Sequence, residues 1–262
     1  MNAMSSMFCF NRRSILIAGA SWARSLVRWQ NPVLGAVFPD EFIRLAEHSG
    51  IIVPLGQFVL DQALRFTKRW QGMLDCDFRI AVNVSPRQFR DPGFVDIVHT
   101  KIVTSGVRPK SLELEITEGV LMSGHAYIDD ALKRLDEMGI ELAMDDFGTG
   151  YSSLSYLRRY PFHVLKIDRS FINYIELDQS DLELVNATIA LAHGLGLRVV
   201  AEGVENEQQS QLLNAKACGL AQGYLFSRPI APEAFEDLLA QQTVQAKDKS
   251  PFALASFKSE IH

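Results

Sequence analysis

The sequence has few cysteines, no long apolar run and no strongly basic segment. Its three cysteines, Cys9, Cys76 and Cys218, lie far apart without CxxC spacing. This argues against a zinc site or disulfide framework and favours a reducing compartment, here the cytoplasm. No stretch reaches the roughly 18 uncharged apolar residues of a membrane span. The net charge of -5, with no basic cluster among aromatics, excludes a nucleic acid polymer as the expected partner.

Acidic residues are also missing from one long stretch, because residues 1–39 contain no Asp or Glu. We interpret 1–22 as an atypical N-terminal segment, either a first strand or the junction of a truncated larger protein. The folded domain is predicted over 23–241. Helical periodicity is lost after it, so 242–262 is predicted to be a disordered tail.

Strand-like and helix-like patterns alternate along the folded domain. Helical segments such as 126–139 carry an apolar stripe at i, i+3 and i+4. Such alternation predicts a parallel sheet, and eight units in this length match a TIM-like (β/α)8 barrel. An open doubly wound sheet is the alternative, although it uses the ends of only two or three strands. The predicted strands lie in 79–85, 111–118, 141–150, 164–171, 198–205, 220–226 and 23–29, with 14–20 as a possible eighth.

Six of these apolar runs end in a carboxylate or amide, where a barrel gathers its functional groups. Oxygen donors at successive strand ends suit a hard ion such as Mg²⁺ or Mn²⁺ better than zinc. Adjacent aspartates can bridge two ions, an arrangement suited to in-line displacement at phosphorus. Lys166 adds a positive point charge. The alternative to a metal site is that these acids form salt bridges around the rim of the barrel. The candidate metal ligands are Asn83, Glu115, Asp145, Asp146 and Glu202.

The ordered motifs from about Leu26 to Ala240 resemble the EAL-domain family, the cyclic di-GMP phosphodiesterases of bacterial signalling. They read LVRWQNP, PDEFIRLAEHSGII, AVNVSPRQF, LELEITE, MDDFGTGYSSLSYL, LKIDRSFI, VVAEGVE and QGYLFSRPI. The resemblance implies a barrel with one antiparallel strand, a two-metal site and hydrolysis of cyclic di-GMP to linear pGpG. It also implies a homodimer whose interface couples to the DFGTGYSS loop.

The resemblance also assigns roles to individual residues. The five oxygen donors above are implied to be the metal ligands, with Glu202 and Lys166 as catalytic residues. Lys166 positions the attacking water, and Glu118 tethers the loop. The residues implied to contact or flank the dinucleotide are Leu26, Arg28, Asp168, Glu205 and Gln222.

The chain departs from the family in the motif that names it. Alignment on LVRW places Arg24-Ser25-Leu26 where the family has Glu-Ala-Leu, so a metal-binding glutamate becomes Arg24. Strand alternation puts Arg24, Leu26 and Arg28 on one face. At roughly 5 Å and an effective dielectric near 20, each unit-charge pair is worth about 3 kcal/mol. A two-unit change beside a metal therefore predicts a large loss of metal affinity.

Three functions follow from this departure. The first is a domain that binds cyclic di-GMP with weak or absent hydrolysis. The second is a phosphodiesterase with residual turnover at a surviving metal position. The third, from another class, is a lyase that forms a Schiff base on Lys166.

Overall fold

The computed structural model describes residues 5–15, 21–73, 78–122, 126–148 and 154–248. Eight strands form a closed cylinder in the order β1-β9-β8-β7-β6-β5-β4-β2, and β1 pairs again with β2. β1 is antiparallel to both neighbours, whereas β2 and β4 to β9 run parallel. The predicted barrel with one antiparallel strand is confirmed. The strands are β1 (Ser5–Ile15), β2 (Ser21–Asn31), β4 (Phe78–Val84), β5 (Leu112–Thr117), β6 (Glu141–Phe147), β7 (Val164–Ile167), β8 (Arg198–Glu202) and β9 (Leu220–Gln222).

The antiparallel strand lies earlier in the chain than the sequence pattern suggested. The pattern offered 14–20 only as a possible eighth strand, whereas β1 covers Ser5–Ile15, and 16–20 fall outside the described residues. Its register is set by hairpin pairing with β2, from Ser5 opposite Gln30 to Arg13 opposite Trp22. An apolar run alone did not reveal that pairing. β3 (Gly35–Val37) adds a short antiparallel extension to β2.

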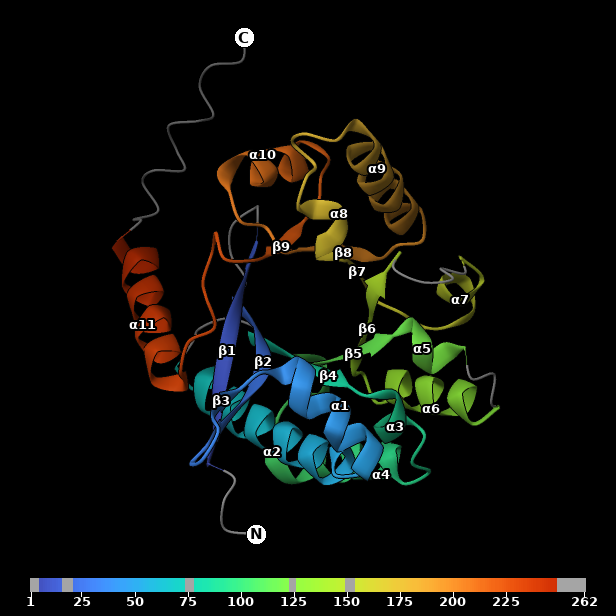
Figure 1. The fold of residues 1–262 in the computed structure, drawn as a ribbon, viewed down its shortest axis with the longest axis vertical. Helices are drawn as coiled ribbons and strands as arrows, with labels where there is room; N and C mark the ends of the chain where they lie inside the picture. Colours follow the sequence, from blue (N-terminus) through green and yellow to red (C-terminus); the bar gives the residue numbers. More distant parts are fainter. Residues whose placement is uncertain (1–4, 16–20, 74–77, 123–125, 149–153, 249–262) are drawn as a thin grey trace.

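Helices pack around the outside of the cylinder (Figure 1). The apolar stripe predicted for 126–139 is buried, with Ile128, Leu132 and Leu135 at 1% exposure or less. The helix over Pro39–Ser49 is capped by Gly50, whose φ of 85° is the left-handed conformation that glycine allows. The helices are α1 (Pro39–Ser49), α2 (Ile52–Gln71), α3 (Pro86–Phe89), α4 (Phe94–Ser105), α5 (Glu118–Leu121), α6 (Ala126–Glu137), α7 (Leu154–Arg159), α8 (Arg169–Ile172), α9 (Gln179–Gly194), α10 (Glu207–Ala215) and α11 (Pro232–Asp248).

The last helix crosses the boundary that we predicted for the domain. α11 continues from Pro232 to Asp248, so the segment interpreted as a tail, 242–262, begins within a helix. Residues 249–262 lie outside the described part of the chain. No helix of the described residues is long and apolar enough to cross a membrane.

Inside the cylinder, a small apolar cluster forms a layer of its own. It consists of Trp22, Ala143, Val164, Val200 and Leu220. Each of these precedes a polar residue of the candidate site by two positions on its strand. Because alternate residues of a strand share a face, the apolar cluster lies one layer beneath the polar one. It is the floor of the site.

Trp22 is the largest side chain of this floor, and two arginine side chains at the amino end of the barrel pack against its ring. The guanidinium of Arg79 lies 4.9 Å from its ring centroid and that of Arg198 lies 4.6 Å away. Glu141 forms ion pairs with both arginines. Trp22 itself is only 7% exposed. Cation–π contact and burial thus fix one ring at the amino end of the barrel.

We predict that Trp22→Ala lowers the free energy of unfolding by about 3–5 kcal/mol, because it opens a cavity beneath the polar layer. Trp22→Phe, which keeps an aromatic ring there, should cost clearly less. Urea denaturation followed by circular dichroism measures both changes. A loss below about 1 kcal/mol for Trp22→Ala would contradict this role for the ring.

Candidate functional site

The side chain of Arg24 points into the ring of carboxylates at the carboxyl end of the barrel. Its Nη1 donates to Glu202 Oε1 at 3.1 Å, and its Nη2 donates to Asp145 Oδ2 at 3.0 Å and Asn83 Oδ1 at 3.1 Å. Nε is in ion-pair contact with Glu115 Oε2 at 2.8 Å. One guanidinium therefore contacts four of the five predicted metal ligands.

Lys166 supplies a second cation to the same acids. The side chain is fully buried, and its Nζ lies 2.6 Å from Asp145 Oδ1, 2.7 Å from Glu202 Oε1 and 2.9 Å from Glu115 Oε2. Burial and the nearby Arg24 lower the pKa of Lys166, but the three carboxylates outweigh them and the pKa is raised. Lys166 is therefore a protonated ammonium.

The same balance applies to Arg24. Burial lowers the pKa of Arg24, while Glu115, Glu202 and Asp145 raise it more, so the net shift is upward. The Arg24 side chain is 16% exposed, and the side chains of two of its partners, Glu115 and Asp145, are almost inaccessible to solvent. Removing a cation from such a set would leave buried charges unpaired, which is costly.

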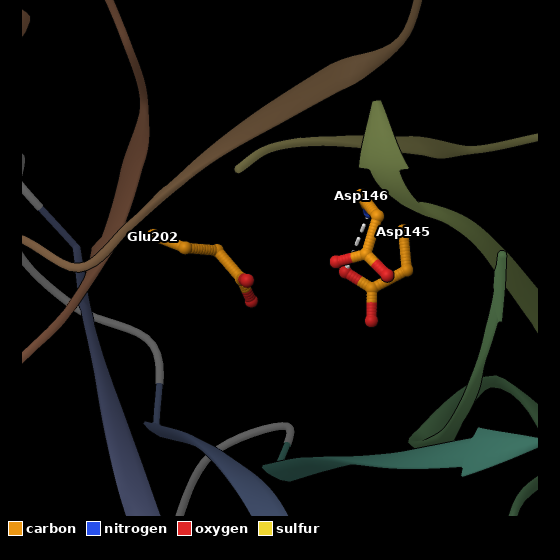
Figure 2. A group of neighbouring side chains, drawn as sticks. All are labelled: Asp145, Asp146 and Glu202. Carbon is orange, nitrogen blue, oxygen red and sulfur yellow. Dashed lines mark hydrogen bonds between the residues drawn. The ribbon is translucent and has the colours of Figure 1, made fainter. Parts of the chain in front are cut away.

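The two adjacent aspartates both face the site because the strand is irregular there. The pairing of β6 with β7 shifts register between Met144 and Phe147. Asp146 has a φ of 56°, which is unusual for a residue other than glycine. Figure 2 shows Glu202 pointing across the lumen toward Asp145 and Asp146. The Asp146 N–H donates to Asp145 Oδ1 at 3.1 Å.

Electrostatics at Asp146 differ from those of its neighbours. Burial raises the pKa of Asp146, and the carboxylates of Asp145 and Glu202 raise it further, to about 6. Lys166 opposes this shift only in part. Strain at φ and an elevated pKa in one residue are typical of a functional position.

These contacts test whether divalent ions fit the site. Asp145, Asp146 and Glu202 offer oxygens that lie within 4.8 Å of one another, which suits one hard cation. The oxygens of Asn83 and Glu115 converge on the guanidinium of Arg24, which also contacts Asp145 and Glu202. The donor set therefore fits one ion and does not fit the pair that the family resemblance implies.

A cavity of about 420 Å³ opens beside Arg24. Leu26 and Arg28, the predicted dinucleotide contacts on β2, line it together with Asn83 and the two aspartates. Arg28 also donates to the carbonyl of Val27 at 2.9 Å. Helices α1 and α2 also line this cavity, and the sequence analysis did not predict their contribution. Their lining residues include Asp40, Ile43, Glu47, Ile52, Leu55 and Val59.

The other predicted residues lie at strand ends but do not line this cavity as described. Asp168 caps α8, where its Oδ1 accepts from the Ser170 N–H at 3.0 Å. Gln222 is buried at the end of β9, opposite Glu202 in the register. Glu205 is exposed. Glu118 is buried at the start of α5. The loop that it was predicted to tether, 146–153, is described only as far as Gly148, and 149–153 lie outside the described residues.

The sequence profile of the EAL domain matches residues 21–229. The chain belongs to the EAL-domain family. Two curated relatives come from Pseudomonas aeruginosa. The cyclic di-GMP phosphodiesterase NbdA is 45% identical over 215 residues, 82% of this chain and 28% of NbdA. The bifunctional diguanylate cyclase/cyclic di-GMP phosphodiesterase MucR is 43% identical over 209 residues, 80% of this chain and 30% of MucR. The chain spans about a third or less of the relatives it matches.

Solved structures of EAL domains superpose closely on the fold. The PaMucR phosphodiesterase in complex with c-di-GMP has a TM-score of 0.84 at 39% identity, covering 88% of this chain and 94% of that one. The EAL enzyme Bd1971, bound to cAMP and cyclic di-GMP, has a TM-score of 0.86 at 32% identity, covering 89% of this chain and 64% of that one.

We predict that the contribution of Asp146 to the stability of the metal-free protein falls as pH rises from about 4 to 6. The pKa of Asp146 is raised from 3.8 to about 6 on folding, so the folded state binds this proton more tightly than the unfolded state. The stabilisation is present at low pH and is lost as the carboxyl ionises. Urea midpoints in chelator, compared between wild type and Asp146→Asn, isolate the effect. An identical pH slope in both proteins would contradict it.

Proposed function

We propose that this domain binds cyclic di-GMP in the cavity beside Arg24 and hydrolyses it weakly or not at all. The observation that carries the proposal is the guanidinium of Arg24 among Asn83, Glu115, Asp145 and Glu202. Two relatives, the cyclic di-GMP phosphodiesterases NbdA and MucR, and the structure of the PaMucR phosphodiesterase in complex with c-di-GMP support the choice of cyclic di-GMP as the ligand.

The loss of hydrolysis follows from charge and position together. Arg24 contributes no carboxylate, and its N–H groups already bond to protein oxygens. A divalent ion about 5 Å from the guanidinium is repelled by roughly 6–7 kcal/mol at an effective dielectric of 20, before screening. Mg²⁺ or Mn²⁺, when bound, supplies the Lewis acid and the activated water for displacement at phosphorus. The guanidinium supplies neither.

In this proposal the chain's own residues have distinct tasks. Leu26 and Arg28 line the cavity that receives the dinucleotide, and Asp168, Glu205 and Gln222 flank it from neighbouring strand ends. Lys166 holds a positive charge against Asp145 and Glu202. Glu118 tethers the loop after β6.

Residual phosphodiesterase activity is the second candidate. It is favoured by one observation, the cluster of Asp145, Asp146 and Glu202 that can hold one ion. A Schiff-base lyase is not supported, because attack on a carbonyl needs an unprotonated amine. Lys166 is instead ion-paired with three carboxylates, and its pKa is raised.

The proposal also includes the cytoplasm as the location and a homodimer as the assembly. Cys218 is a buried free thiol, as expected in a reducing compartment. Exposed apolar side chains on and before α9, Tyr174, Leu177 and Leu184, are 60%, 82% and 47% exposed. Leu184 also lines a hollow with Gly148, at the start of the DFGTGYSS loop. Such a patch suits a partner of the same chain.

We predict that wild type binds cyclic di-GMP but forms pGpG at least about 100-fold more slowly than Arg24→Glu, which restores a carboxylate beside the metal site. Isothermal titration with cyclic di-GMP in Ca²⁺ measures binding, and chromatography of the products in Mn²⁺ measures turnover. Arg24→Lys is the matched control. It keeps the positive charge and should remain as slow as wild type. Equal rates in wild type and Arg24→Glu would overturn the proposed loss of activity, and no binding would overturn the ligand.

We predict that Leu177→Asp shifts the protein from dimer to monomer, because it places a charge in the exposed apolar patch. Sedimentation velocity measures the assembly at matched concentration. Val103→Asp is the control, since Val103 is 65% exposed on α4 and lies outside this patch. A monomeric wild type, or equal dissociation by both variants, would contradict the proposed interface.

A further inference from the structure

We infer that Arg87 is a positioning residue for the cavity beside Arg24, because its guanidinium holds helix α1 in place as one wall of that cavity. The inference deepens the proposed function, since this is the cavity assigned to cyclic di-GMP. Its first readout is the exchange of α1 amides in the absence of dinucleotide, so it can fail independently of the proposed ligand.

The first observation concerns what α1 faces. One side of the helix lines the cavity beside Arg24 through Asp40, Ile43 and Glu47. The other side lines a second, apolar hollow of about 240 Å³ between α1, β2 and the start of α2. The α1 residues of this hollow are Phe42, Leu45, Ala46 and Ser49. The helix therefore separates two hollows, and its position decides the width of both.

The helix makes few contacts that would fix this position. All eleven of its residues are described, and two of them, Phe42 and Ala46, are buried. Its N-cap residue, Phe38, has no side-chain oxygen to accept a hydrogen bond from the first turn. At the other end, the Gly50 N–H donates to the Glu47 carbonyl at 3.4 Å, which is long for such a bond. Because an isolated helix of this length is marginal in water, other elements must hold α1.

Arg87 provides such a contact at the C-terminal end of α1. Its Nη1 donates to the His48 carbonyl at 3.1 Å and also to the Glu47 carbonyl. The last carbonyls of a helix lack intrahelical partners, and a guanidinium placed there satisfies them and opposes the negative end of the helix dipole. The fit is close, because a Cβ on Gly50 would lie 3.0 Å from Arg87 Nη2.

The segment that carries Arg87 is itself firmly held. Ser85 and Gln88 form a capping box at the start of α3, and Phe89 is fully buried. Gln88 lies so close to α2 that a Cβ on Gly56 would come within 1.6 Å of its Nε2. α3 is therefore a fixed support from which Arg87 can hold a less firmly packed helix.

The path from this support to the site is short. α3 follows β4, whose Asn83 accepts a hydrogen bond from Arg24 at 3.1 Å. Glu47 lines the cavity while its carbonyl accepts from Arg87. Loss of the Arg87 side chain would thus release the end of α1 that carries Glu47. A wall that must be ordered when the ligand arrives lowers the affinity for that ligand.

The first measurement is hydrogen–deuterium exchange of the protein without dinucleotide, read at the amides of α1. Arg87→Ala should speed exchange there by about tenfold or more, because the capping hydrogen bonds limit local opening. Helix α4 is the internal reference and should keep its wild-type rate. Arg87→Lys retains a cationic donor for the carbonyls and should recover much of the protection. Arg90→Ala is the matched control, because it removes an exposed arginine three residues further along the chain.

The second measurement is the affinity for cyclic di-GMP, by isothermal titration in Ca²⁺. Arg87→Ala should bind about tenfold more weakly than wild type, because α1 spends less time in the position that binding requires. Arg87→Lys should lie between these two proteins. Arg90→Ala should match wild type in both measurements.

Several outcomes would overturn the inference. Unchanged α1 exchange in Arg87→Ala would do so whatever the affinity. Faster exchange with unchanged affinity would show that Arg87 only caps a helix. Equal acceleration in α4, or the same effects in Arg90→Ala, would show a general loosening in place of a local role. Absence of binding by wild type would count against the proposed ligand, and the exchange rates would still decide whether Arg87 holds α1.

Discussion

The structure of the site depends on the pairing of two buried cations with a ring of carboxylates inside a closed barrel. Arg24 and Lys166 share Glu115, Asp145 and Glu202 as partners, at distances between 2.6 and 3.1 Å. Buried acids at this density are stable only when opposite charge lies among them. In this chain a side chain provides charge that a metal ion would otherwise have to bring.

The architecture supports this arrangement from beneath. Each residue of the apolar floor lies two positions before a polar residue of the site, as Trp22 does for Arg24 and Val164 does for Lys166. The floor excludes water from the lumen below the acids. It thereby keeps the local dielectric low and strengthens the ion pairs above it.

Much of this could be predicted from residue patterns. The barrel follows from alternating strand and helix periodicities, and the oxygen donors follow from polar residues at the ends of apolar runs. Strand alternation put Arg24, Leu26 and Arg28 on one face, and the family resemblance made that face the lumen side. The family membership that the motifs indicated is confirmed by the profile match over residues 21–229.

Other features could not be predicted from the sequence, because they depend on contacts between distant parts of the chain. The start of β1 depends on pairing with β2, which no local propensity encodes. The role of Trp22 as a floor, held by Arg79 and Arg198, depends on three strands that are far apart in sequence. The lining contributed by Asp40 and Glu47 depends on how α1 lies against the strand ends, and the sequence showed these acids only as part of a family motif.

The closure of the barrel has a consequence for how the chain folds. β1 lies between β2 and β9, so Arg13 pairs opposite Gln222, more than 200 residues later. Contacts of such separation form slowly, because a long loop must be ordered before they add stability. During synthesis the cylinder stays open, with an unpaired edge on β1, until the last strand has left the ribosome. The domain therefore becomes resistant to aggregation and proteolysis only when nearly its whole length is present.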